Sequence, residues 1–179
     1  MSTDDCIFKL LVGGEGGVGK TTILARYLQG EFVNDMKMTV GAQFHVARLE
    51  RNGAKVRIAF WDLGGQDQFR FILPSYCLGA HGAFVLFDMS RYGTLEATKD
   101  WIDLFKKSAP PGIPMMLVGT KYDAIMNDAE QAASMDALGN QFAREFGCIG
   151  YASTSSRIGL NVAESIHFMV DHLIQLLNK

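Results

Sequence analysis

The feature that most constrains the fold of this chain is a glycine-rich loop near the N-terminus. Residues 14–21 have the sequence GEGGVGKT, which fills the pattern GxxxxGK[ST]. The apolar segment 7–12 that leads into the loop has the composition of a buried strand, and a helix is expected over 20–29. A strand, a glycine-rich loop and a helix in this order predict an α/β fold in which the loop follows the carboxyl end of a strand.

The residue types in this loop suit a phosphate ligand. Glycines let backbone N–H groups turn inward around anionic oxygens, and the helix that follows would point its positive dipole end at the same place. Lys20 would add positive charge at the β- and γ-phosphates, and the Thr21 hydroxyl can bind Mg2+. The loop therefore predicts a nucleoside triphosphate site rather than a glycine turn without a ligand. The loop residues expected to bind the nucleotide are Gly14, Glu15, Gly16, Gly17, Val18, Gly19, Lys20, Thr21 and Thr22.

The rest of the chain alternates between strand and helix patterns. Strands are predicted near 7–12, 43–50, 55–61, 83–88, 114–119 and 148–152. Helices are predicted near 20–29, 68–77, 94–107, 128–146 and 162–177. Asn52-Gly53 predicts a two-residue hairpin, so the second and third strands should be antiparallel and the others parallel. We expect an α/β fold of the P-loop NTPase type over residues 1–179. It would be a single domain with a six-stranded, mostly parallel sheet, one antiparallel edge strand and helices on both faces.

Charge and composition exclude several classes of protein. The 179 residues include 17 basic and 19 acidic side chains, without the positive excess that drives nonspecific nucleic-acid binding. No apolar run reaches the roughly 18 residues of a transmembrane helix. Cys6, Cys77 and Cys148 are widely separated, which favours reduced thiols over a disulfide framework or a zinc site. We expect a cytoplasmic protein, monomeric, with no transmembrane segment and no nucleic-acid partner.

No lipidation signal is present in this chain. Ser2 stands where myristoylation needs glycine, and residues 176–179 contain no cysteine for prenylation. Peripheral membrane attachment would therefore depend on a C-terminal tail that has been removed.

A second motif follows the third predicted strand. Asp62 closes the apolar run 56–61, where a carboxylate can hold the Mg2+ shell from the side opposite Thr21. A lone aspartate at a strand end could equally cap a helix. Here it is followed by Gly64-Gly65-Gln66, in which Gly65 can offer an N–H to the γ-phosphate and Gln66 can orient a water.

With these motifs the chain resembles the Ras superfamily of small GTPases over nearly its whole length. Within that superfamily it is similar to Rab-like proteins, to the GTPases of fungal septation and mitotic exit, and to archaeal Ras-like relatives. The resemblance implies that Thr39, in the run 38–41, binds Mg2+ and the γ-phosphate, and that Phe32 lies against the guanine. It also implies a Mg2+ ligand set of Thr21, Thr39 and Asp62.

The family selects guanine with an NKxD motif, which the run Thr120-Lys121-Tyr122-Asp123 resembles. A carboxylate at Asp123 would accept hydrogen bonds from the N1–H and the exocyclic amine of guanine, a donor pair that adenine lacks. Lys121 would cover the base plane. Thr120 replaces the usual asparagine and cannot make the same amide contacts. Where the family has SAK, this chain has Ser155-Ser156-Arg157, with the Ser156 N–H expected at the guanine O6.

The resemblance implies a switch that binds GTP or GDP with Mg2+ and hydrolyses GTP. Hydrolysis is expected to depend on Gln66, Lys20, Thr39 and Gly65. Residues 30–41 contain Lys37 but no arginine, so we expect a slow intrinsic rate and strong stimulation by a GTPase-activating protein that donates one. This protein, an exchange factor and effectors would bind residues 30–45 and 61–77.

Two alternatives compete with this interpretation. The chain could hold GTP or GDP as a binding module with little or no hydrolysis, acting as a structural or interaction protein. It could also be a small-molecule kinase, but such an enzyme needs an arginine-bearing lid, and only Arg144 and Arg157 follow Arg91.

Two further positions bear on partners and exchange. The aromatic residues Phe44, Trp61 and Tyr76 match a triad that Rab-like proteins present to effectors, although ordinary packing on paired strands would explain them equally well. Met36 stands where Ras-like proteins often have a tyrosine that closes over the phosphates. Its presence predicts a more open loop and faster nucleotide exchange.

Overall fold

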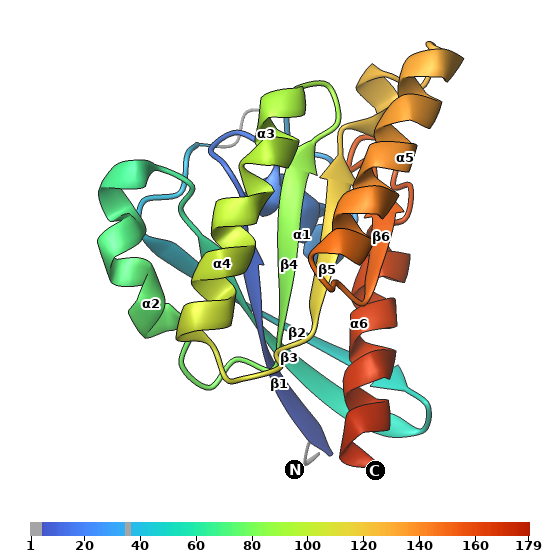
Figure 1. Cartoon of the computed structure of the whole chain (residues 1–179). Coiled ribbons are helices and arrows are strands. Elements are labelled where there is room, and N and C mark those ends of the chain that lie inside the picture. Colours follow the sequence, from blue (N-terminus) through green and yellow to red (C-terminus); the bar gives the residue numbers. More distant parts are fainter. Residues whose placement is uncertain (1–4, 35–36) are drawn as a thin grey trace.

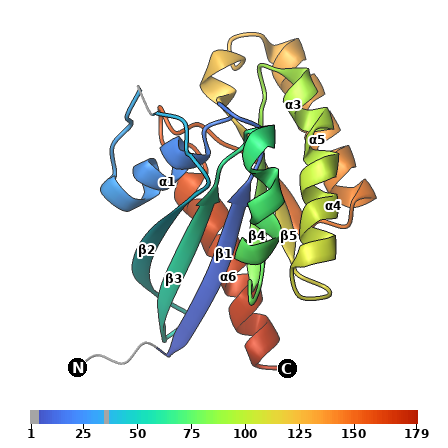
Figure 2. The same ribbon diagram turned by 90° about the vertical axis from the view of Figure 1, so that its left-hand side faces the viewer.

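The computed structural model describes residues 5–34 and 37–179 and contains one six-stranded sheet (Figure 1). The strands are β1 (Cys6–Gly13), β2 (Ala42–Arg51), β3 (Ala54–Leu63), β4 (Gly82–Asp88), β5 (Met115–Thr120) and β6 (Gly150–Ser153). They lie in the order β2-β3-β1-β4-β5-β6, and Figure 2 shows β2, β3 and β1 side by side. Only the pair β2–β3 is antiparallel, joined at Asn52-Gly53. The predicted sheet and its antiparallel edge strand are confirmed.

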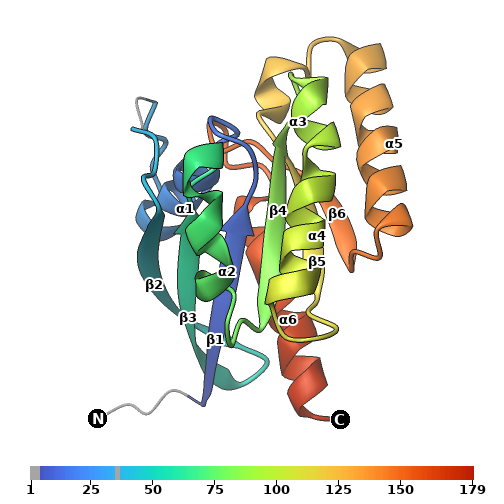
Figure 3. The same cartoon turned by 60° about the vertical axis from the view of Figure 1, so that its left-hand side comes forward.

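Helices cover both faces of the sheet, as predicted (Figures 1 and 3). The α-helices are α1 (Lys20–Gln29), α2 (Leu73–Tyr76), α3 (Tyr92–Glu96), α4 (Thr98–Ser108), α5 (Ala129–Glu145) and α6 (Val162–Leu177). Two 3-10 helices, η1 (Asp67–Ile72) and η2 (Tyr122–Ala124), lie between them. One face packs against α1 and α6, and the other against α2, α3, α4 and α5. No helix in the described ranges is long and apolar enough to cross a membrane.

Two predicted helices differ from the structure. The segment 68–77 forms η1 and only a single turn of α-helix, because η1 buries none of its side chains and so lacks the apolar face that stabilises a helix. The segment 94–107 is divided into α3 and α4. At the division the Thr98 hydroxyl donates to the Leu95 carbonyl at 2.5 Å, a local side-chain bond of the kind that competes with regular helix.

The core consists of two apolar layers, one on each face of the sheet. Every residue of β4 and β5 is buried, as expected for central parallel strands covered on both sides. Trp101 and Phe105 of α4 pack so closely on the end of β1 that a Cβ at Gly13 would lie 2.6 Å from the Trp101 ring. This packing leaves the carboxyl ends of the parallel strands at one edge of the sheet, where the loops with the predicted motifs meet.

The packing of α4 predicts a large loss of stability for Phe105→Ala. Phe105 is 0% exposed, and truncating a buried phenylalanine to alanine costs about 3–5 kcal/mol because a cavity remains. Urea unfolding followed by circular dichroism measures the free energy of unfolding.

The matched control is Phe168→Ala, since Phe168 lies on α6 and is 47% exposed. It should lose less than about a third of that value. Equal losses for the two variants would contradict the role of α4 in the core.

Candidate functional site

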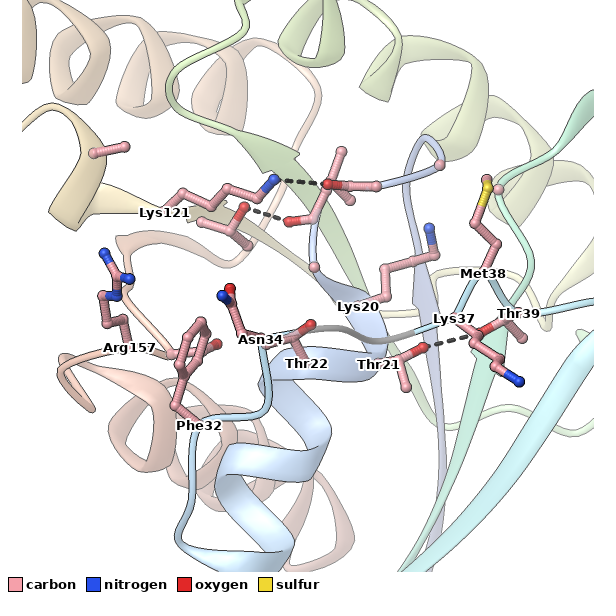
Figure 4. Close-up of a pocket in the computed structure, with 18 of the residues that line it drawn as sticks. Lys20, Thr21, Thr22, Phe32, Asn34, Lys37, Met38, Thr39, Lys121 and Arg157 are labelled. Carbon is pink, nitrogen blue, oxygen red and sulfur yellow. Dashed lines mark hydrogen bonds between the residues drawn. The ribbon is translucent and has the colours of Figure 1, made fainter.

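The loops at this edge enclose a cavity of about 380 Å³ (Figure 4). Many of the residues predicted from the sequence line it together, although they come from five separate segments of the chain. They are Gly16, Gly17, Val18, Gly19, Lys20, Thr21, Thr22, Phe32, Thr39, Gly65, Thr120, Lys121, Asp123, Ser156 and Arg157. The sequence analysis did not single out the lining residues Asn34, Lys37, Met38 and Ala124.

Lys20 is a buried cation at the wall of the cavity. Its Nζ donates to the carbonyl oxygens of Gly14 at 2.7 Å and Glu15 at 2.9 Å, and the residue is 6% exposed. Burial lowers the pKa of Lys20 to about 8, against the opposing charges of Asp62 and Glu15. A buried lysine that has mainly carbonyl partners favours an anionic ligand beside it. Gly14 and Glu15 do not line the cavity themselves; their carbonyls position this amine.

Thr120, the last residue of β5, binds the glycine-rich loop through its hydroxyl. Its Oγ1 lies 2.5 Å from the carbonyl oxygen of Val18 and 3.0 Å from that of Phe87. The side chain is shorter than that of asparagine, yet it reaches the glycine-rich loop. Next to it, Lys121 donates from Nζ to the Gly17 carbonyl at 2.8 Å. Two neighbouring side chains at the end of β5 therefore hold two neighbouring carbonyls of the loop.

Three oxygen-bearing side chains meet beside Lys20. The Thr21 hydroxyl donates to Asp62 Oδ2 at 2.5 Å and lies 2.9 Å from the Thr39 hydroxyl, which is 3.5 Å from the same carboxylate oxygen. Burial raises the pKa of Asp62, and its buried Oδ1 has no hydrogen-bond partner. Hard oxygen donors and a buried, unpaired carboxylate oxygen fit Mg2+. The described residues contain no cluster of three or more His, Cys, Asp or Glu, so such an ion would depend on hydroxyls and on oxygens of a ligand.

The opposite end of the cavity carries the residues predicted to contact a base. Ser155, which is buried and does not line the cavity, donates from Oγ to Asp123 Oδ1 at 2.7 Å and so orients that carboxylate. The Arg157 guanidinium lies 5.7 Å from the centre of the Phe32 ring. Figure 4 shows Phe32, Arg157 and Lys121 at one end, and Lys20, Thr21 and Thr39 at the other. The two ends of the cavity therefore differ: one carries the residues predicted to contact a base, and the other carries those predicted to contact phosphates and Mg2+.

The segment that follows β3 touches the glycine-rich loop directly. A Cβ on Gly65 would lie 2.4 Å from the Gly16 nitrogen, so only glycine permits this approach. The next residue, Gln66, points elsewhere: its Nε2 lies 3.3 Å from Met38 Sδ, and its Oε1 accepts from Gln68 at 2.9 Å. Gln66 is not among the residues that line the cavity, although its partner Met38 is, and its role in orienting a water stays a prediction. Met36 lies outside the described residues.

The sequence analysis missed two side chains, one that contacts the glycine-rich loop and one that contacts Lys121. Arg70 of η1 binds Glu15 of the loop at 2.7 Å, and its guanidinium stacks on Trp101 of α4. Asp88 ends β4 and binds Lys121 at 2.9 Å. The position of Asp88 at a strand end is the same pattern that identified Asp62, but no motif around it indicated a partner.

Comparisons with known proteins agree with this geometry. The sequence model described as Ras family matches residues 9–175. The chain is 32% identical to the Ras-related protein Rab-8B of Homo sapiens over 177 residues, which are 99% of this chain and 83% of the relative. It is 32% identical to Rab-15 of Bos taurus over 96% of this chain and 78% of the relative. It is 33% identical to Rab-19 of Xenopus laevis over 95% of this chain and 78% of the relative.

The contact of Thr120 with the loop predicts that Thr120→Val destabilises the protein. Valine has nearly the same shape but leaves the buried Val18 carbonyl without its donor, which costs about 1–3 kcal/mol. Thr120→Ser keeps the hydroxyl and should retain most of the stability. The measurement is the free energy of unfolding in urea, and equal values for the two variants would contradict a role for the hydroxyl.

Proposed function

This chain belongs to the Ras family of small GTP-binding switch proteins, and we propose that it binds GTP or GDP with Mg2+, hydrolyses GTP slowly and cycles between effector-binding states. One observation carries the proposal: a single cavity has a positioned carboxylate, Asp123, at one end and the buried amine of Lys20 at the other. Guanine offers two adjacent donors to a carboxylate, whereas adenine would leave the charge unpaired.

The phosphates of this nucleotide would lie along the glycine-rich loop. Lys20 would exchange its carbonyl partners for β- and γ-phosphate oxygens, and the start of α1 would add its dipole. Thr21, Thr39 and Asp62 would hold Mg2+, which neutralises charge on the β- and γ-phosphates. Thr39 then connects the segment before β2 to the nucleotide, and Gly65 connects the segment after β3. Both segments would therefore depend on whether a γ-phosphate is present.

Hydrolysis needs a change at Gln66. Its amide must leave Met38 and Gln68 and turn toward the γ-phosphate in order to orient a water. Two arginines contact the loop: Arg70 pairs with Glu15, and Arg91 pairs with Asp88 and lies 3.5 Å from the Gly16 carbonyl oxygen. Among the described residues, Arg157 is the one arginine that lines the cavity, and it lies at the Phe32 end, away from Lys20. A slow intrinsic rate and an activating protein that donates an arginine follow from this arrangement.

The two segments that contact the nucleotide site also form an exposed apolar surface. Met38, Val40, Phe44 and Phe71 are all more than half exposed. Phe44 packs edge-on against Trp61, with ring centres 5.5 Å apart, and Trp61 contacts the Tyr76 ring at 5.4 Å. The three aromatic residues thus form one continuous cluster across both segments, which supports their presentation to effectors. We propose that effectors, the activating protein and the exchange factor bind residues 30–45 and 61–77.

A second candidate is a GTP- or GDP-binding module with little or no hydrolysis. The contacts of Gln66 favour it, because its side-chain amide is bonded to Met38 and Gln68. Turnover of GTP with and without an activating protein separates the two functions.

The base assignment predicts that the purified protein carries GDP or GTP. Release by heat, followed by chromatography, identifies the nucleotide. ATP, or no nucleotide together with no measurable affinity for GDP, would contradict the proposal.

Asp123→Asn should lower GDP affinity by a factor of at least about 100, since the amide presents a donor toward the guanine amine. Xanthosine diphosphate, which has a carbonyl at that position, should bind the variant better than GDP does. Competition with labelled nucleotide measures both affinities. Asp103→Asn, on the exposed face of α4, is the matched control and should leave them unchanged.

Gln66→Leu should leave GTP affinity within a factor of about 2 and lower single-turnover hydrolysis by roughly tenfold or more, because no side chain then orients the water. Gln68→Leu is the matched control: it removes a partner that holds Gln66 outside the cavity, so hydrolysis should be unchanged or faster. Equal rates for Gln66→Leu and the unaltered protein would favour the binding-module alternative.

A further inference from the structure

Asp88 is a buried carboxylate behind the glycine-rich loop, at the end of β4. Its side chain is 2% exposed. The two oxygens have different partners: Oδ1 accepts from the backbone N–H and the hydroxyl of Ser90 at 2.9 and 2.6 Å, whereas Oδ2 pairs with Lys121 at 2.9 Å and Arg91 at 3.0 Å. Burial by itself would raise the pKa of Asp88, but these hydrogen bonds outweigh it and keep the pKa below the ordinary value. Asp88 therefore stays charged and holds two cations on one oxygen.

Both cations reach the loop. Lys121 Nζ donates to the Gly17 carbonyl at 2.8 Å, and Arg91 Nη2 lies 3.5 Å from the Gly16 carbonyl, a longer contact. With the Thr120 hydroxyl on the Val18 carbonyl, three consecutive carbonyls of the loop contact side chains from the ends of β4 and β5.

The direction of these carbonyls decides where the loop N–H groups point. In a planar trans peptide the C=O and the following N–H point in opposite directions. Because Arg91, Lys121 and Thr120 contact the carbonyls of residues 16, 17 and 18, the N–H groups of Gly17, Val18 and Gly19 point away from these three side chains, and all three residues line the cavity. The Val18 N–H also donates to the Glu15 carbonyl within the loop at 3.4 Å. A row of backbone N–H groups of this kind is the arrangement that binds phosphate oxygens.

We infer that Asp88 is a positioning residue of the phosphate site: it holds Lys121 and Arg91 on the carbonyls of Gly17 and Gly16, and so sets how long a nucleoside diphosphate stays bound. Its backbone is fixed in turn, because its N–H donates to the Thr94 hydroxyl at 2.8 Å. The inference rests on the proposed function for the identity of the ligand. It adds that the end of β4 controls nucleotide release through one carboxylate.

The experiment compares three variants of the full chain by the dissociation rate of fluorescent GDP at fixed Mg2+. Asp88→Asn keeps the shape of the side chain but removes the negative charge that pairs with both cations. The dissociation rate should therefore rise about tenfold or more. Arg91→Gln removes one of the two cations at a half-exposed position and should raise the rate about threefold. Ser90→Ala is the matched control, since it removes a bond to Oδ1 and leaves the oxygen that holds the cations. Its rate should change less than about twofold.

A second measurement separates positioning from loss of folding. The 31P resonance of the bound β-phosphate should shift in Asp88→Asn and Arg91→Gln but not in Ser90→Ala, because only the first two release the loop carbonyls. The double variant should dissociate GDP little faster than Asp88→Asn, since Arg91 acts through Asp88. If Asp88→Asn does not fold, Arg91→Gln tests the inference by the same two measurements, the GDP dissociation rate and the 31P resonance of the β-phosphate.

The inference is overturned if Asp88→Asn or Arg91→Gln behaves as Ser90→Ala does in both measurements. Failure of the unaltered protein to bind GDP would be a different result, because it would overturn the proposed function itself. Binding by the unaltered protein with no effect of the variants rejects only the role of Asp88.

Discussion

The site depends on the backbone of a short loop in which five consecutive carbonyls, those of residues 14–18, contact side chains. A buried carbonyl without a partner is costly, so each must find a donor elsewhere. The loop supplies one donor itself, the Lys20 amine on the first two carbonyls. The next three are held by Arg91, Lys121 and Thr120, which belong to other parts of the chain. The face of the loop that we propose binds phosphate therefore depends on these contacts with other parts of the chain as well as on its glycines.

The order of the sheet makes this possible. Strand β1 lies next to β4, and β4 lies next to β5, so the ends of these parallel strands bring Asp88 and Thr120 beside the loop that follows β1. On the other side β3 pairs with β1 and brings Asp62 to Thr21. A ligand in the cavity would thus contact side chains from nearly every strand end at this edge. The same loops that hold the ligand connect to the exposed aromatic surface of β2 and β3.

The site also contains groups that are poorly satisfied without a ligand. Lys20 is a buried amine with a lowered pKa, and Asp62 has a buried oxygen without a partner. Such groups lower the stability of the empty protein and are relieved by an anion and a cation, respectively. The geometry therefore links stability to occupancy. It also favours a nucleotide bound together with Mg2+ over either ligand alone.

The sequence by itself determined the α/β class, the hairpin at Asn52-Gly53, and which loops carry the chemistry. These depend on short-range backbone geometry, on periodicity and on glycines at fixed spacing, all of which a linear pattern records. It did not predict that 68–77 begins as a 3-10 helix and contains only one turn of α-helix, because that depends on how little of the segment is buried. Only the tertiary structure decided that Thr120 reaches the loop, that the Gln66 amide is bonded to Met38, and that Asp88 holds Lys121 and Arg91. These contacts join residues up to 102 positions apart, so they depend on which strands are neighbours and on how closely their ends approach.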